Sequence, residues 1–426
     1  MDKQVLSGVR VLSMETGIVD AVTIQGSLLG GDVFSPQSNS AVAEMTAAML
    51  DQGTVYRDKF AISAALEEVG ASLAFSSGNT HVRFVAKCLS KDIPLVVELL
   101  AEQLRSPLMS EEDLVPARKR RVGEVRKSKE DTRTRAMEAF LQEIYPENHP
   151  NYFIPIARQI SDTGEVGAET LKRFHAENYG TGNLIIVAVG AVDRTVLEET
   201  VAERFDGWQK SPLSIDSASG LRANKREREY NHVVTMEDKT SVDLLIGEPI
   251  GIDRNHPDFH PLMVGQYILG GNFAARMMAS VRDEEGLTYG IRSAIGGVDN
   301  GTDGYWYIWG TFAPDLIDRG RKSTLVQLNK WLDEGVTQHE LDTKKSTITG
   351  TYAVSLATTS GLAGQIAGTV EQGRKLSYID EYPGIIDTLT LEEVNSAISN
   401  YCHGDALVTV AAGAINRDWS PLVKEE

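Results

Sequence analysis

The sequence predicts an α+β protein made of two tandem duplicated domains, each a mostly antiparallel sheet packed with helices. The main observation is an internal repeat, in which residues 178–194 (NYGTGNLIIVAVGAVDR) match residues 400–417 (NYCHGDALVTVAAGAINR) after one inserted residue. A strand, a long helix and a second helix also recur in the same order in both halves of the chain. Repetition after about 200 residues indicates a duplication rather than a short solenoid repeat.

In the first half, alternating or continuous apolar residues bounded by turn residues predict strands at 9–14, 21–29, 71–77, 81–89 and 184–189. Helical spacing of apolar residues predicts helices at 38–51, 59–69, 93–105, 111–129, 133–144 and 168–177. A loop is expected at 145–155.

In the second half, a strand at 305–312 and helices at 317–332 and 339–356 are expected. They parallel the strand at 81–89 and the two helices that follow it. The polar stretch between the halves has little periodicity and is typical of a linker. We therefore expect a first domain at 1–208, a linker at 209–231 and a second domain at 232–426.

Composition excludes several classes of function. The chain has 426 residues, 42 basic against 60 acidic, and a net charge of −18, which argues against a nucleic-acid partner. The basic run at 118–121 fits a solvated helix face. Cys88 and Cys402 lie far apart without a partner motif, so neither a disulfide framework nor a thiolate zinc site is expected.

No membrane span is expected, and no membrane partner follows from this composition. Residues 1–10 are polar and lack the apolar core of an export signal. We expect a cytoplasmic protein, or a periplasmic one if a signal peptide has been removed.

One stretch of the second half carries a candidate site. Residues 274–285 are helix-forming, and Gly286 follows where a left-handed cap is wanted, so Arg282 falls in the last helical turn. Tyr289 follows at the start of a predicted strand. Two fixed donors aimed at one point can bind a carbonyl or oxyanion. The alternative is an arginine on a solvated helix face and a packing tyrosine.

This stretch resembles the signature of the insulinase/pitrilysin family of zinc peptidases, which includes the mitochondrial processing peptidases. The matching residues are Leu269, Gly270, Gly271, Arg282, Gly286, Leu287 and Tyr289. The resemblance implies that the two domains form half of a peptidase clamshell. It also implies that Gly270, Gly271, Arg282 and Tyr289 bind a peptide substrate, with the Arg282/Tyr289 pair near the scissile bond.

The metal motif of that family is degenerate in this chain. Active members carry His-x-x-Glu-His on a helix, where two histidines one turn apart hold zinc and the glutamate activates a water. Counting back from Gly53-Thr54, the matching positions hold Glu44, Ala47 and Ala48, and Glu124 lies close to the place of a further zinc ligand. Glu44 and Glu124 alone make at most a weak oxygen site, and ordinary helix carboxylates are the simpler interpretation. We expect no metal here.

His256 and His260 have the spacing of a metal pair, but Phe259 stands where the catalytic glutamate belongs. Pro257, with nearby Asp253, instead indicates the start of a helix.

The resemblance therefore implies the non-catalytic, Arg/Tyr-bearing subunit of a heterodimeric zinc endopeptidase. The partner is expected to be a homologous chain that carries His-x-x-Glu-His and the zinc. A structural or assembly subunit derived from a peptidase is the alternative, and a metalloenzyme built on His256 and His260 is a third hypothesis.

Overall fold

In the computed structural model, residues 2–215, 221–224, 227–299 and 301–422 are described. They form two compact units, each made of segments from both halves of the chain. The first unit comprises the described residues of Met1–Glu124, Ala157–Ile215 and Thr351–Glu381. The second comprises those of Val125–Ile156, Asp216–Gly350 and Tyr382–Glu426.

The first unit is organised around a six-stranded sheet with the order β1-β2-β6-β3-β5-β4. Its strands are β1 (Asp2–Leu6), β2 (Val9–Glu15), β3 (Ala21–Leu29), β4 (Ser72–Ser77), β5 (His81–Leu89) and β6 (Leu184–Gly190). β2 and β6 run parallel, and the other neighbours run antiparallel. The sequence predicted all of these strands except β1, whose mixed DKQVL pattern carries little periodicity.

The second unit has a five-stranded sheet with the order β7-β11-β8-β10-β9. Its strands are β7 (Tyr230–Thr235), β8 (Val242–Pro249), β9 (Thr288–Gly296), β10 (Tyr305–Phe312) and β11 (Val408–Gly413). This order repeats β2-β6-β3-β5-β4 of the first unit, with β7 and β11 as the parallel pair. The predicted α+β fold with two duplicated, mostly antiparallel sheets is confirmed.

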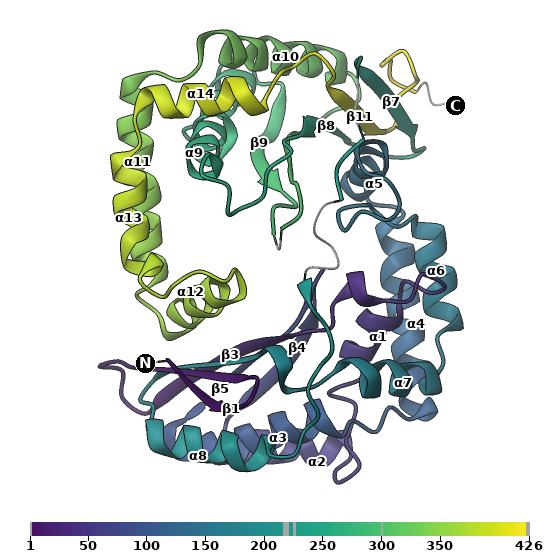
Figure 1. The fold of residues 1–426 in the computed structure, drawn as a ribbon. Coiled ribbons are helices and arrows are strands. Elements are labelled where there is room, and N and C mark those ends of the chain that lie inside the picture. Colours follow the sequence, from purple (N-terminus) through teal and green to yellow (C-terminus); the bar gives the residue numbers. More distant parts are fainter. Residues whose placement is uncertain (1, 216–220, 225–226, 300, 423–426) are drawn as a thin grey trace. The chain divides into compact units, whose positions relative to one another are not determined.

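Helices cover both faces of each sheet. In the first unit, one face packs against α1 (Val42–Ala48), α2 (Lys59–Glu68), α3 (Ile93–Arg105), α7 (Ala168–Asn178) and α8 (Arg194–Phe205), and Figure 1 shows α2, α3 and α8 beside this sheet. The other face packs against α12 (Thr359–Glu371), whose Ala363 and Ile366 join a cluster with Leu12 and Val187.

In the second unit, one face packs against α9 (Phe259–Gly270), α10 (Ile317–Glu334) and α14 (Leu391–Tyr401). The other face packs against α5 (Thr132–Ile144), whose Phe140 lies with Leu245 and Val410. The two halves of the sequence therefore exchange one helix each, since α5 comes from the first half and α12 from the second.

The exchanged helices are tied to their sheets at equivalent places. Near the start of α12, the hydroxyls of Thr359 and Thr23 lie 2.8 Å apart. At the start of α5, the hydroxyl of Thr132 donates to the buried carboxylate of Asp243. Thr23 and Asp243 hold the same register, because they face Val189 and Ala412, which match in the repeat. The duplication thus extends to individual contacts.

The remaining described α-helices are α4 (Glu111–Ser128), α6 (Ile156–Glu165), α11 (Gln338–Ser355) and α13 (Tyr378–Thr388). None of the helices in the described ranges is both long and apolar enough to cross a membrane. α1 is shorter than the helix predicted at 38–51. The residues just before it are held in a non-helical conformation by hydrogen bonds to side chains. The Asp162 carboxylate accepts hydrogen bonds from the amide and hydroxyl of Ser40, and Asn39 accepts one from the amide of Ala41.

A buried polar cluster fixes part of the expected linker in the second unit. Residues 216–220 and 225–226 of that linker lie outside the described residues, but the Ala223 amide donates to Asp303 at 3.0 Å. The other carboxylate oxygen of Asp303 lies 2.7 Å from Nε2 of His149, and both side chains are almost fully buried. Tyr145 stacks on the His149 ring. The predicted loop at 145–155 is thus joined to the β9–β10 connection and to the linker.

Candidate functional site

We call the predicted pair of donors, Arg282 and Tyr289, the candidate clamp. The segment that carries it follows α9, whose end packs against β9. A Cβ on Gly270 would lie 2.2 Å from the backbone nitrogen of Ser293, so only glycine permits this approach of helix and strand. A Cβ on Gly271 would lie 2.5 Å from the ring of Tyr267. Both glycines therefore have packing reasons to be present, and their contact with a substrate stays a prediction.

Arg282 lies in a π-helix, Met278–Glu284, where an ordinary α-helix was predicted over 274–285. The wider winding is visible in the backbone, because the Glu285 amide donates to the Ser280 carbonyl at 3.0 Å. Gly286 adopts φ +63°, as expected for the predicted left-handed cap. π-helices are rare and are frequent at functional sites, so this irregularity marks the segment.

Contacts with α11 hold the start of this segment. Arg276 forms a two-pronged ion pair with Glu340 at 2.5 and 2.7 Å. Burial alone would raise the pKa of Glu340, but hydrogen bonds from Arg276 and Thr337 lower it to about 2. The Lys344 ammonium donates to Oδ1 of Asn272 and to the Ala274 carbonyl, both at 2.9 Å. Sequence reasoning missed these residues because they meet only in the folded unit.

Both predicted clamp residues are accessible. The Arg282 side chain is about one third exposed (36%) and contacts Asp283 at 3.1 Å. Tyr289 is 88% exposed. The Leu287 amide, just before β9, donates to the Val281 carbonyl in the π-helix at 3.0 Å. Among the described contacts no hydrogen bond joins Arg282 to Tyr289, so their convergence on one ligand atom stays a prediction.

Tyr289 owes its exposure to a β-bulge at the edge of the sheet. Gly290 faces Thr311 and Thr288 faces Phe312, which leaves Tyr289 without a partner on β10. Such bulges redirect a side chain and occur often next to active sites. Because β9 is the last strand of its sheet, its outer edge also carries backbone groups that no other strand of the sheet pairs.

The degenerate metal position is assembled by α1 and α4. Glu44 forms an ion pair with Arg121 at 2.8 Å, and Arg121 also lies 3.5 Å from Glu124. Ala47 is buried, and neither it nor Ala48 offers a ligand or a base. In the described part of the chain, no group of three or more His, Cys, Asp or Glu residues could hold a metal ion. The residues present do not fit a zinc site.

Asp32 lies close to this position. Loss of surrounding water and the neighbouring Glu44 carboxylate raise the pKa of Asp32 to about 7, against smaller opposing effects of Ser77 and Arg121.

We expect Asp32→Asn to change the pH dependence of stability. The folded state binds the Asp32 proton more tightly than the unfolded state, whose pKa is 3.8, so wild-type stability falls as pH rises toward about 7. The variant should be more stable than wild type at pH values above that window and lose this advantage below it. Urea denaturation across the range measures the difference. A difference that does not change with pH would contradict the shift.

The two histidines of the other candidate motif pack against different tyrosines. Asp258 is the N-cap residue of α9 and accepts a hydrogen bond from the Tyr401 hydroxyl at 2.7 Å. His256 packs edge-on against Tyr401, whereas His260 packs against Tyr382. This part of the chain serves to start and seat α9, as predicted.

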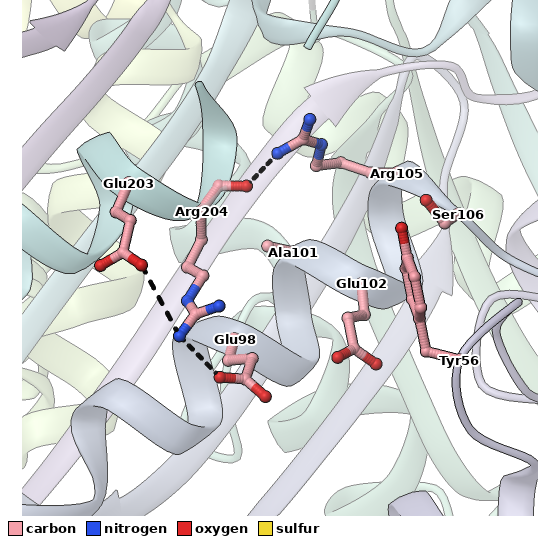
Figure 2. Close-up of a pocket in the computed structure, with 8 residues that line it drawn as sticks. All are labelled: Tyr56, Glu98, Ala101, Glu102, Arg105, Ser106, Glu203 and Arg204. Carbon is pink, nitrogen blue, oxygen red and sulfur yellow. Dashed lines mark hydrogen bonds and ion pairs between the residues drawn. The ribbon is translucent and has the colours of Figure 1, made fainter. Parts of the chain in front are cut away.

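A surface cavity of about 340 Å³ lies between α3 and α8 in the first unit (Figure 2). Its charges neutralise one another, since Arg204 pairs with Glu98 at 2.9 Å and Glu98 also pairs with Arg57 at 2.7 Å. Arg105 donates to the carbonyls of Arg204 and Asp206 at the end of α8. These contacts join two helices, and we assign the cavity no ligand.

Comparison with known families identifies two matching regions. Residues 10–151 match the family described as insulinase (peptidase family M16), and residues 165–348 match the peptidase M16 inactive domain. A Helicobacter pylori protein described as a non-peptidase homolog, YmxG, is 22% identical over 400 residues, covering 92% of this chain and 88% of its own length. An uncharacterized zinc protease of Streptomyces coelicolor is 23% identical over 353 residues, covering 82% of this chain and 75% of its own length.

Two solved structures share the fold. A peptidase M16 inactive domain from Pseudomonas fluorescens has a TM-score of 0.85 at 22% identity and covers 98% of this chain and 96% of its own. A protease from Helicobacter pylori has a TM-score of 0.86 at 18% identity and covers 97% of this chain and 99% of its own.

Proposed function

Because the chain belongs to the insulinase (M16) family of peptidases, we propose that it is the non-catalytic, substrate-binding subunit of a heterodimeric zinc endopeptidase. A homologous partner that carries His-x-x-Glu-His would supply the zinc and the hydrolytic chemistry. This chain would supply Arg282 and Tyr289 as donors to the carbonyl oxygen of the scissile bond, where negative charge develops during the reaction.

The degenerate metal position and the Arg282/Tyr289 pair differ in a way that supports the proposal. Glu44, Ala47 and Ala48 leave the metal position without its histidines and catalytic glutamate, while Arg282 in a π-helix and Tyr289 at a β-bulge are accessible to a ligand. The free edge of β9 beside Tyr289 supports peptide binding, because an extended peptide can add to such an edge through its main chain.

A structural or assembly role is the second candidate. The name of the Helicobacter pylori relative, a non-peptidase homolog, favours it. A scaffold has no evident need for an exposed tyrosine held by a bulge, and for that reason we place it second.

We expect the isolated chain to bind no stoichiometric zinc and to have no endopeptidase activity, because Ala47 and Ala48 cannot activate or hold a metal-bound water. Elemental analysis and a peptide-cleavage assay of the purified chain measure both. Affinity purification from the native source should bring down a similar chain that binds zinc, and activity should follow that pair. One tight zinc per isolated chain, or a native complex without any peptidase-like subunit, would contradict the proposal.

A further inference from the structure

The basic run at 118–121 was expected on a solvated helix face. One of its residues, Arg121, instead lies at the degenerate metal position. Arg121 lies one turn before Glu124 on α4 and reaches Glu44 on α1. Its Nε lies 2.8 Å from Glu44, and its Nη1 lies 3.5 Å from Glu124. One guanidinium thus contacts the two carboxylates that stand at, or close to, former metal-ligand positions.

The negative charge of the neighbouring carboxylates explains why the Arg121 guanidinium lies here. Glu44 and Glu124 both contact this guanidinium, and Asp32 interacts electrostatically with Glu44 and Arg121. A guanidinium keeps its charge at any physiological pH, and its planar fork can meet carboxylates from two directions. Without Arg121, the negative charge of Glu44 and Glu124 would be left unbalanced, and hard divalent cations are attracted to carboxylate oxygens.

We propose that Arg121 is an internal cation that holds Glu44 and Glu124 together and keeps divalent metal ions away from this position. Loss of zinc binding in this chain would then depend on a gained arginine as well as on lost histidines. The proposal concerns this chain alone and does not depend on the partner or on peptide binding.

The experiment rebuilds the metal motif with and without this arginine. Glu44→His, Ala47→Glu and Ala48→His are combined in the full chain, and Arg121→Met is added in a second variant. Zinc affinity is measured by competition with a chromophoric chelator, and the zinc-dependent change in melting temperature is measured alongside. Arg120→Met replaces Arg121→Met in a matched control, because Arg120 is an exposed neighbour on the same helix.

We expect Arg121→Met to tighten zinc binding by about 10- to 100-fold on this background, the range over which groups around a metal site tune its affinity. Arg120→Met removes the same formal charge and should have little effect, because its charge lies in solvent. Equal zinc affinity with and without Arg121, or an equal gain from Arg120→Met, would overturn the proposal.

A second arm uses the native motif, since Ala47→Glu places a carboxylate at a buried position and can prevent folding. Arg121→Met alone leaves Glu44 and Glu124 without the guanidinium that contacts them. Added Mn²⁺ should then raise the melting temperature of Arg121→Met more than that of wild type or Arg120→Met. Equal Mn²⁺ responses in all three proteins would overturn the proposal even if the rebuilt motif does not fold.

Discussion

Arg282→Ala, mixed with the zinc-bearing partner, is expected to lower kcat by about a hundred- to a thousandfold. Removal of one donor to a developing oxyanion costs about 2.7–4 kcal/mol in other enzymes. Because the Arg282 side chain is partly exposed and its one described side-chain contact is with Asp283, its loss should leave the fold and heterodimer formation intact. Tyr289→Phe removes only a hydroxyl from an exposed ring and should act in the same direction.

Kinetics separate this role from simple substrate anchoring. Loss of an interaction made in the transition state lowers kcat and kcat/KM together, whereas loss of uniform binding raises KM. Arg292→Ala and Tyr56→Phe are matched controls, because each removes the same group as a clamp variant from an exposed residue outside the proposed clamp. Full activity of both clamp variants with a verified partner would reject the clamp and favour the assembly role.

The sequence predicted the strands of the first sheet better than the way in which the helices pack on it. Strands such as 21–29 and 184–189 are recognisable because their apolar runs end in glycine. The exchange of α5 and α12 could not be predicted, since the spacing of Phe140 or Ile366 shows an apolar face but not which sheet it covers. The predicted boundaries at 208 and 232 describe the repeat, whereas compactness groups α5 with the second sheet and α12 with the first.

In the candidate site too, local features could be predicted from the sequence, whereas contacts between distant segments could not. Gly286 predicted the left-handed helix cap correctly, because few residues other than glycine adopt a positive φ. The sequence analysis predicted neither the π-helix around Arg282 nor the bulge at Tyr289, and the nearby contacts of Arg276 and Lys344 join segments far apart in the sequence. The pairing of Arg121 with Glu124 had a local signal in their spacing, but its contact with Glu44 joins distant helices.

Asp303→Ala is expected to destabilise the protein by about 1–3 kcal/mol, the usual cost of leaving a buried hydrogen-bonding group without its partner. The change leaves the Nε2 of His149 and the amide of Ala223 without the acceptor they share. The buried Nε2 of His149 would then have an unmet hydrogen-bonding need, which is more costly than the loss of an exposed contact.

Urea denaturation measures this loss, and amide hydrogen exchange at Ala223 should speed up because its acceptor is gone. Asp299→Ala is the matched control on the same β9–β10 connection. Its carboxylate is 60% exposed and pairs with Arg254, so we expect a change of about 0–1 kcal/mol. His149→Ala combined with Asp303→Ala should cost much less than the sum of the single changes, because each removes the same pair. Additive losses, or equal effects of Asp303→Ala and Asp299→Ala, would show that this cluster does not hold the linker in place.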